Sequence, residues 1–452
     1  MSKPVEINIG RQDVVWNYLA TFLQIGSGVL LFPIILRMLP SETVGIWAIF
    51  ISITAMVNML DFGFSPSFTR NVTYIFSGVN KLEKTGISEQ KIELGINFQL
   101  LSDIILSMKW FYKRIALAAL LSLSVLGSLY LFYILNTNYN SDKVEVWISW
   151  AIFCFVNTYN IYTLYYDSLM LGSGKVMRNK QIIIVSQIGY LTTALALILS
   201  DAGIVGIVAA QFVSLIIKRF LSYKSFFTPQ LRNELPLAEV KSVKEIIRVI
   251  MPNSIKIGIT SIGSFLGYES VIIVGSLYLP LEQLASYGIS IQIIGVIASL
   301  GMVYYSSYMP KVAFLRVQKD LLKIRKIYWI SVFILLSVFV VSGAILVFAG
   351  NEILVLLKSN TFLLSGSMLL GLLTINLLEK NHAMAGGFLL TNNEVPYYKA
   401  AIISGIVTVI LLFLFVKVLN WGIWGMILAP GISQLAYQNW KWPLHLMQQL
   451  KQ

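Results

Sequence analysis

The sequence contains very few of the residues on which disulfides and metal sites depend. Its one cysteine, Cys154, excludes an internal disulfide, and together with two histidines it is too little for a zinc site of the usual kind. Charged residues make up only 12% of the 452 residues, about half the share found in soluble domains. We therefore expect no bound metal and no soluble catalytic domain.

Nucleotide-binding motifs are also missing. The segment Gly172-Ser173-Gly174-Lys175 resembles part of a phosphate loop, but it lacks the four-residue spacer and the hydroxyl residue after the lysine. The triplet Asp61-Phe62-Gly63 matches the magnesium motif of protein kinases, but no other kinase motif accompanies it. We expect no ATP hydrolysis by this chain and no cofactor.

What the sequence does contain is apolar side chains. Hydrophobic residues make up 57% of the chain, and the mean hydropathy is +0.75. This surplus needs an apolar solvent, which the lipid bilayer provides. The net charge of +13 would suggest nucleic acid in a soluble protein. Here the basic residues form short strips between apolar runs, so they indicate membrane topology and contact with anionic membrane lipid, not nucleic acid.

Apolar runs of the length of a membrane span follow one another along the whole chain. They predict an all-α polytopic membrane protein with about twelve transmembrane helices. Most of the 34 Lys and Arg residues fall in the loops on the side of the two termini, which the positive-inside rule assigns to the cytoplasm. The predicted spans are 14–36, 43–66, 115–136, 146–171, 181–200, 203–223, 250–277, 284–309, 327–348, 365–390, 399–418 and 421–441.

The two halves of the chain resemble each other. Leu39–Trp47 aligns without gaps with Leu279–Tyr287, 240 positions later, and Asp201–Gly206 aligns with Asn420–Gly425, 219 positions later. An even number of helices in each half gives both halves the same orientation. The repeat predicts an N-terminal lobe, 1–235, and a C-terminal lobe, 236–452. In transporters built this way the substrate is expected at the interface of the lobes.

Charged side chains inside the predicted spans are candidate functional residues, because each costs about 2.5–3.5 kcal/mol at a helix centre unless it is paired or hydrated. Glu379 and His382 are three residues apart on one helix face and are expected to line a cavity together. The alternative is that this helix ends at Leu378, which would leave the pair at the cytoplasmic surface. The repeat favours the first interpretation, since it aligns Glu379 with Asn160 inside another span. The complete set is Asp61, Lys256, Glu269, Glu379, Lys380 and His382.

Three further patterns have a packing interpretation beside a functional one. Gly263 and Gly267 have the spacing that allows two helices to approach closely. The tyrosines at 159, 162, 165 and 166 fit an interfacial belt or packing, and also a hydrated vestibule that accepts sugars. The segment 97–112 fits either a helix along the membrane surface or an ordinary cytoplasmic linker.

Two segments resemble a known family. Leu60–Asn71 resembles the (F/L)-D-(L/F)-G-(L/F)-x-x-x-x-x-R segment of bacterial polysaccharide transporters. These form the O-antigen flippase-like family of the multidrug/oligosaccharidyl-lipid/polysaccharide (MOP) exporter superfamily. The stretch from Glu379 to His382, followed by Thr391–Pro396, is similar to the tenth helix of that family and its exit loop. The helix count and the two lobes extend the resemblance to essentially the whole chain.

The resemblance implies a flippase in the bacterial inner membrane that moves an undecaprenyl-pyrophosphate-linked oligosaccharide, as in lipopolysaccharide O-antigen synthesis. It makes Arg70, Lys256 and Lys380 candidates for binding the pyrophosphate. It makes Asp61, Glu269, Glu379 and His382 candidates for gating or for coupling to a cation. Glycosyltransferases and a polysaccharide polymerase would be its partners. The chain departs from the family in having few basic residues deep in the bundle, so the sequence does not predict a strongly cationic cavity.

Other functions remain as alternatives. A cation-coupled multidrug antiporter of the same superfamily favours acidic cavity residues, and Asp61, Glu269 and Glu379 fit it. A lipid II flippase usually has two further helices, for which no apolar residues remain. A membrane-bound glycosyltransferase or polymerase needs a long external catalytic loop, and the predicted external loops are short. We therefore expect a transporter and not an enzyme.

Overall fold

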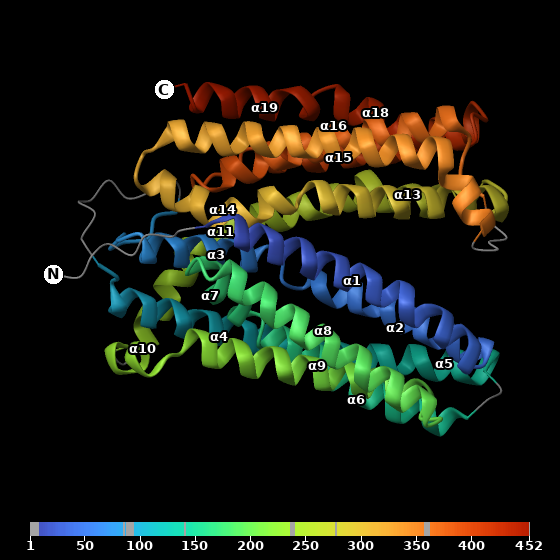
Figure 1. Ribbon diagram of the computed structural model, residues 1–452, viewed down its shortest axis with the longest axis horizontal. Helices are drawn as coiled ribbons and strands as arrows, with labels where there is room; N and C mark the ends of the chain where they lie inside the picture. The colour runs from blue at the N-terminus through green and yellow to red at the C-terminus, as the bar shows by residue number, and fades with distance from the viewer. Residues whose placement is uncertain are drawn as a thin grey trace. The chain divides into compact units, whose positions relative to one another are not determined.

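The computed structural model describes residues 9–84, 86, 95–139, 142–235, 240–275, 278–356 and 362–451, and within these ranges it contains helices and no strand (Figure 1). The chain divides into two compact units. Unit 1 comprises Met1–Leu82 and Ser88–Met251, and unit 2 comprises Glu83–Ile87 and Pro252–Gln452. The division falls inside one helix, at Pro252, whereas the predicted lobe boundary lies before that helix, at 235.

In unit 1, α8 packs against α1 on one side and α9 on the other, α6 packs against α4 and α9, and α3 packs against α7 (Figure 1). The aromatic rings of Phe50, Trp150 and Phe153 pack together in its core, with centroids 4.6–5.5 Å apart. The helices of unit 1 are α1 (Arg11–Met38), α2 (Ser41–Met59), α3 (Phe64–Phe76), α4 (Phe98–Ser122), the π-helical η1 (Leu123–Gly127), α5 (Ser128–Asn138), α6 (Lys143–Tyr162), α7 (Tyr165–Gly172), α8 (Val176–Leu199), α9 (Gly203–Phe226) and α10 (Pro229–Glu234).

In unit 2, α16 packs against α15 and α19, and α17 packs against α18 and η2. Glu83 and Lys84 belong to unit 2, although they precede α4 of unit 1 in the sequence. Side-chain amides of unit 2 hold them: Asn253 donates to the Lys84 carbonyl at 2.8 Å, and Asn393 donates to the Glu83 carbonyl at 2.7 Å. The helices are α11 (Val240–Ser264, shared with unit 1), η2 (Phe265–Glu269), α12 (Ser270–Gly275), α13 (Leu281–Gly301), α14 (Val303–Val317), α15 (Leu321–Leu356), α16 (Gly366–Leu390), α17 (Tyr398–Leu412), η3 (Phe413–Val418), α18 (Ile423–Leu435) and α19 (Gln438–Gln449).

The predicted all-α fold is confirmed, and each predicted span coincides with one helix or with consecutive helices. By length and composition, six helices in the described part of the chain can cross a membrane, or up to eight if each bent pair counts as one span. The remaining predicted spans are interrupted or carry more polar residues. In α16, for example, Glu379, Lys380 and His382 lower the hydropathy.

Two details differ from prediction. The run 43–66 is not one helix: α2 ends at Met59, and a turn with left-handed backbone at Phe62 (φ 47°) and Gly63 (φ 78°) precedes α3. The segment 97–112 is not a separate surface helix, because it forms the first half of α4. There Asp103, Ser107 and Tyr112 are buried. The polar residues of this segment are buried against neighbouring helices. They lower its hydropathy, which is why the predicted span begins only at residue 115.

Backbone geometry confirms the internal repeat. Pro40 precedes α2 with φ −56° and ψ 145°, and Pro280 precedes α13 with φ −57° and ψ 142°. At the second offset, Asp201 and Asn420 are both left-handed, with φ 59° and 55°, and so are the glycines two residues later. Such values are uncommon for residues other than glycine, so the same turn has been kept at equivalent places in both units.

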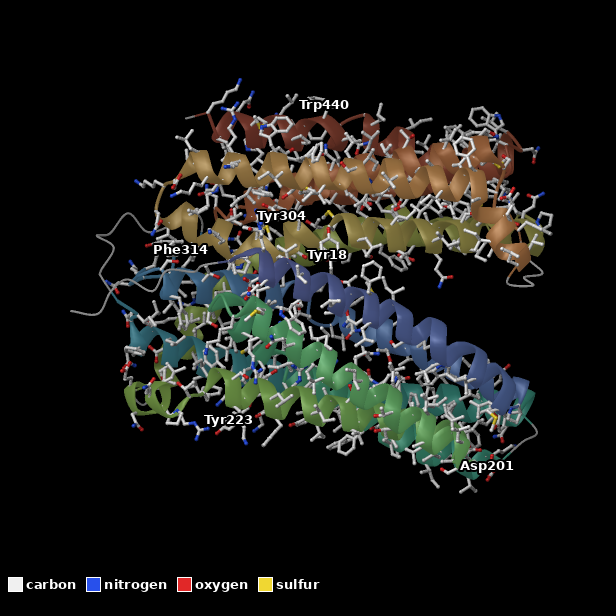
Figure 2. The ribbon with its side chains drawn as sticks, in the orientation of Figure 1. Tyr18, Asp201, Tyr223, Tyr304, Phe314 and Trp440 are labelled. Carbon is white, nitrogen blue, oxygen red and sulfur yellow. The ribbon has the colours of Figure 1, made fainter. Side chains whose placement is uncertain are left out.

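Large apolar side chains cover the outer surfaces of both units. Phe348 and Leu356 of α15 are 81% and 82% exposed. The aromatic side chains of Tyr223 and Trp440 point outward from their helices (Figure 2). Buried positions include many polar residues, such as Asn157 and Gln438. A soluble protein does not expose so much apolar surface, so the chain is a multi-pass membrane protein with its outer side chains in lipid.

Candidate functional site

Unit 2 encloses a polar cavity of about 210 Å³ among α11, η2, α16, α17, α18 and α19. A space of this size holds several water molecules when its walls offer hydrogen-bonding groups. The polar side chains on its walls include those of Thr260, Ser264, Tyr268, Glu379, His382, Gln434 and Gln438.

Glu379 and His382 both line this cavity, as their spacing on one helix face predicted. They belong to α16, which continues without a break to Leu390. The alternative prediction that this helix ends at Leu378 is therefore wrong. The helix continues because the segment after Leu378 packs closely, with Met384, Ala385 and Phe388 fully buried.

Each of the two cavity residues has a defined partner. An oxygen of the Glu379 carboxylate lies 2.6 Å from the ammonium of Lys380, and the Glu379 side chain is only 13% exposed. Nδ1 of His382 lies 2.7 Å from Oδ1 of Asn439. Because an amide oxygen only accepts hydrogen bonds, Nδ1 carries the proton in this arrangement. The site thus combines a carboxylate, its ammonium partner and a histidine of fixed tautomer.

Two buried donors in the cavity wall make no hydrogen bond. The hydroxyl of Tyr268 and the indole nitrogen of Trp442 are both buried, and both residues line the cavity. A buried donor without a partner costs about 1–3 kcal/mol, so these groups favour water or a ligand with acceptor atoms in the cavity. In the same cavity, Gln438 donates to Ser404 and to Gln434.

The other predicted residues of unit 2 lie outside this cavity. The Lys256 ammonium lies over the ring of Tyr398, 5.7 Å from its centroid, which is a cation–π contact. Glu269 is exposed at the end of η2, although its neighbour Tyr268 lines the cavity. Lys380 reaches the site only through its ion pair with Glu379.

Asp61 and Arg70 belong to unit 1. Asp61 follows α2, and its carboxylate accepts hydrogen bonds from the Ser65 backbone amide at 3.0 and 3.1 Å and from the Tyr112 hydroxyl at 2.7 Å. The contact with Ser65 satisfies one free backbone amide in the first turn of α3, as an N-terminal cap does. Arg70 is buried on α3, with 5% of its surface exposed. Within unit 2 the structure therefore brings together Glu379, Lys380 and His382 and leaves Lys256 and Glu269 outside their cavity.

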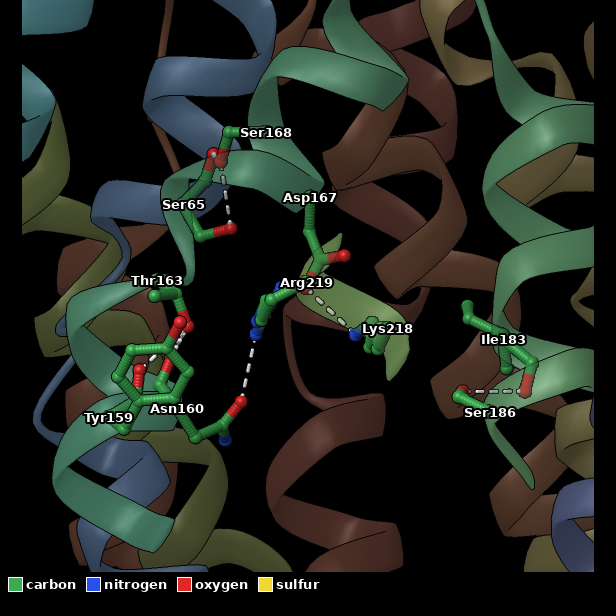
Figure 3. Close-up of polar contacts among 10 residues, drawn as sticks. All are labelled: Ser65, Tyr159, Asn160, Thr163, Asp167, Ser168, Ile183, Ser186, Lys218 and Arg219. Carbon is green, nitrogen blue, oxygen red and sulfur yellow. Dashed lines mark hydrogen bonds and ion pairs between the residues drawn. The ribbon is translucent and has the colours of Figure 1, made fainter. Parts of the chain in front are cut away.

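Unit 1 contains a charged cluster that the sequence did not reveal, formed by Asp167, Lys218 and Arg219 (Figure 3). One carboxylate oxygen of Asp167 lies 2.9 Å from the Lys218 ammonium and 3.0 Å from the Arg219 guanidinium. The available signal was Asp167, a charge inside the predicted span 146–171. Lys218 and Arg219 resemble loop charges in the sequence because they lie near the end of a span.

The tyrosines of α6 and α7 form an aromatic cluster. Tyr165 and Tyr166 stack at 4.3 Å, and Tyr166 meets the edges of Tyr223 and Phe227 at 6.4 and 6.3 Å. These contacts support the packing interpretation of the tyrosine pattern.

Gly263 lies at a close contact between α11 and α17. A β-carbon at this position would lie 2.5 Å from the carbonyl oxygen of Ala401 and 2.7 Å from the amide nitrogen of Ile402. Both are backbone atoms, so the helices themselves would have to move apart. Gly263 therefore has the packing role that small residues serve in membrane helices.

We expect Gly263→Ala to destabilise unit 2 by about 1–3 kcal/mol, the usual cost of overpacking. The measurement is the thermal unfolding midpoint of the purified protein in detergent. Gly288→Ala in α13 is the control, because a β-carbon there meets nothing within 4 Å. Equal unfolding midpoints for the two variants would contradict the assigned contact.

No protein-family model matches the chain, and no curated protein sequence matches it. Solved structures do. An outward-facing multidrug resistance MATE family transporter of the MOP superfamily superposes with a TM-score of 0.74 at 13% identity, covering 100% of this chain and 99% of the other. A MATE structure in the bent conformation gives 0.71 at 13% identity, covering 98% and 95%.

The chain has the fold of MOP-superfamily transporters. A third structure with this fold is a MOP superfamily transporter from Pyrococcus furiosus Vc1, described as having a binding pocket of reverse polarity that suggests a different function. It gives a TM-score of 0.72 at 14% identity, covering 100% of this chain and 99% of the other. At such identities the similarity concerns the fold, including the layout of about twelve helices in two lobes.

Proposed function

We propose that the chain is a MOP-type transporter that flips a lipid-linked oligosaccharide across the bacterial inner membrane by alternating access. The observation that carries this proposal is that side-chain amides line the cavities between the membrane helices of both units. Gln434 and Gln438 line the cavity of unit 2, and Asn157, Asn160, Gln187 and Gln211 line one in unit 1. Amides hydrogen-bond sugar hydroxyls in both directions, as donors and as acceptors.

A transporter is needed because a headgroup of sugars and pyrophosphate cannot cross about 30 Å of hydrocarbon unaided. We assign ion coupling to Glu379 and His382, since they share one cavity. Protonation of Glu379 would remove its charge and release the Lys380 ammonium, now 2.6 Å away. Lys380, Arg70 and Lys256 are the proposed contacts of the pyrophosphate, and Asp61 and Glu269 are proposed gating residues.

A second candidate function is a cation-coupled multidrug antiporter. It is favoured by the description of a structural neighbour as a multidrug resistance transporter and by the Glu379 carboxylate in a cavity with the aromatic residues Tyr268 and Trp442. An antiporter for organic cations needs uncompensated negative charge to bind them. Glu379, however, already has Lys380 as its partner.

The two functions are separated by transport in proteoliposomes that contain the purified chain. One set carries a radiolabelled undecaprenyl-pyrophosphate-linked oligosaccharide, and the other is given ethidium under a proton gradient. We expect transfer of the glycolipid to the opposite leaflet, detected by a glycosidase outside the vesicles, and no ethidium accumulation. Ethidium transport without glycolipid transfer would establish the antiporter instead.

For such a flippase, glycosyltransferases must supply the substrate on the cytoplasmic side, and a polymerase or ligase must consume the product outside. The proposed orientation places both termini in the cytoplasm. It can be tested because Cys154, the one cysteine of the sequence, is buried and leaves few background thiols.

We expect Ser200→Cys, in the exposed turn between α8 and α9, to react with a membrane-impermeant maleimide in intact cells. Lys451→Cys at the exposed C-terminal end should react only after the cells are permeabilised. Both variants are made on a Cys154→Ser background, with the unsubstituted background as the control. Labelling of the two positions from the same side would reject the predicted topology.

A further inference from the structure

Unit 1 has a second cavity with polar walls, of about 320 Å³, among α2, α6, α8 and α9, and it is open to the outside of the unit. Its walls carry the side-chain amides of Asn157, Asn160, Gln187 and Gln211, together with the hydroxyls of Ser214 and Tyr190. The amides of this cavity also support the proposed function, but none of the residues assigned above to ion coupling, gating or pyrophosphate contact lines it.

A basic group forms one wall of this cavity. Lys218 lines it directly, with its side chain 24% exposed. Behind the wall, Arg219 is 3% exposed and donates to Oδ1 of Asn160 at 2.8 Å (Figure 3). Since Asn160 itself lines the cavity, the guanidinium lies one side chain away from the open space.

The charges of this group do not balance. Asp167 contributes one carboxylate against the two cations of Lys218 and Arg219, and Lys180 of α8 interacts electrostatically with both Lys218 and Asp167. Asp167 contacts both of its partners through the same oxygen, and its other carboxylate oxygen is buried without a hydrogen bond. The group beside the cavity therefore carries an excess of positive charge, which favours an anionic ligand.

The equivalent place in unit 2 has lost this basic character. At the offset of 219, Arg219 corresponds to Gln438 and Asn160 to Glu379. Both of these residues line the cavity of unit 2. The two halves therefore share a polar cavity near the same place in the fold, but only unit 1 surrounds it with an excess of positive charge.

We propose that the cavity of unit 1 binds a phosphoryl group carried on a polar, hydroxyl-bearing headgroup. The Lys218 ammonium contacts the phosphoryl oxygens as a point charge. Arg219 lies behind Asn160 and attracts the anion electrostatically without touching it. The amides of Gln187 and Gln211 meet the remaining polar atoms of the headgroup. Identifying this ligand with the pyrophosphate of a lipid-linked sugar rests on the proposed function, whereas a phospholipid headgroup presents the same chemistry.

The test measures binding of farnesyl pyrophosphate to the purified full-length protein by isothermal titration calorimetry. Lys218→Gln removes the cation that lines the cavity and leaves Asp167 paired with Arg219. We expect its affinity to fall at least tenfold. Lys224→Gln is the matched control, because Lys224 is on the same helix but exposed, with its ammonium over the Phe220 ring. Its affinity should stay within twofold of the unsubstituted protein.

A second variant does not depend on Lys218. Gln211→Glu keeps the size of a cavity side chain and adds a negative charge, so it should also weaken binding at least tenfold. Unchanged affinity in both Lys218→Gln and Gln211→Glu would overturn the site.

Competition identifies the source of the phosphoryl group. Displacement of farnesyl pyrophosphate by phosphatidylglycerol in mixed micelles assigns the site to phospholipid, and its failure assigns the site to pyrophosphate carriers. The protein could also bind farnesyl pyrophosphate in a way that depends on Lys218 but transfer no glycolipid in proteoliposomes. That result would reject the proposed function and support the anion site.

Discussion

Replacing Glu379 with Gln is expected to lower glycolipid transfer at least tenfold while the protein still reaches the membrane. The substitution keeps the shape of the side chain and removes the charge that now faces Lys380 at 2.6 Å. If a change in protonation at this carboxylate drives the transport cycle, an amide cannot perform it. The cavity itself should stay intact, because its other walls come from five further elements.

His382→Ala should have a similar effect, for a separate reason. It removes the hydrogen bond to Asn439 and leaves that buried amide without its partner. It also exposes Glu379 to a larger aqueous space. Loss of transport in both variants, with unfolding midpoints within a few degrees of the unsubstituted protein, would place both side chains in the transport step.

Matched controls exist for each substitution. Glu352 of α15 is exposed and lies outside the cavity, so Glu352→Gln tests the loss of a carboxylate elsewhere. His445 of α19 packs against the Trp442 ring at 6.4 Å without lining the cavity, so His445→Ala tests the loss of a histidine. Both controls should transport normally. Unchanged surface polysaccharide in cells that carry Glu379→Gln or His382→Ala would remove these residues from the mechanism.

The sequence predicted those features that depend on local periodicity. Glu379 and His382 share a cavity because residues three apart share a helix face, and the paired turns at Asp201 and Asn420 follow from the repeat. The break between α2 and α3 was not predicted, because the run 43–66 is apolar enough overall to be interpreted as one span. The helix is interrupted by the turn at 60–63, where Phe62 and Gly63 have left-handed backbone.

Features that depend on distant partners could not be predicted in the same way. Asp167 lies 51 and 52 residues from Lys218 and Arg219, and no spacing rule connects them. The ion pair of Glu379 with Lys380 was equally hidden, since adjacent residues on a helix do not normally face each other. The long lysine side chain reaches back over the helix surface, which hydropathy and periodicity do not describe.

The repeat makes the charge differences between the units informative. A duplicated fold would at first carry the same side chains in both cavities. Here residue 160 is an amide bound to Arg219, and residue 379 is a carboxylate bound to Lys380. The Asp167 carboxylate of unit 1 is held between cations, and the corresponding position in unit 2 is Gly386. The two cavities therefore differ in charge: the cavity of unit 1 is proposed to bind an anionic headgroup, and the cavity of unit 2 contains the carboxylate proposed for ion coupling.

Asp167→Asn is expected to destabilise the protein by about 3–5 kcal/mol, because removing one partner of a buried ion pair leaves the other charges uncompensated. Arg219 is the residue most affected, since its side chain is only 3% exposed and cannot reach water. The measurement is the unfolding midpoint in detergent, followed by intrinsic tryptophan fluorescence. Adding Lys218→Gln to Asp167→Asn removes one of the two cations that have lost their carboxylate partner. The double variant should therefore recover part of the lost stability.

The pair of Asp320 and Lys323 gives the contrasting case. It is also a short ion pair, at 2.7 Å, but its side chains are 27% and 67% exposed. Exposed pairs contribute about 0–1 kcal/mol, so Asp320→Asn should leave the unfolding midpoint nearly unchanged. If Asp167→Asn is as stable as Asp320→Asn, the charges around Asp167 are solvated, and the excess positive charge that the anion site requires is not buried.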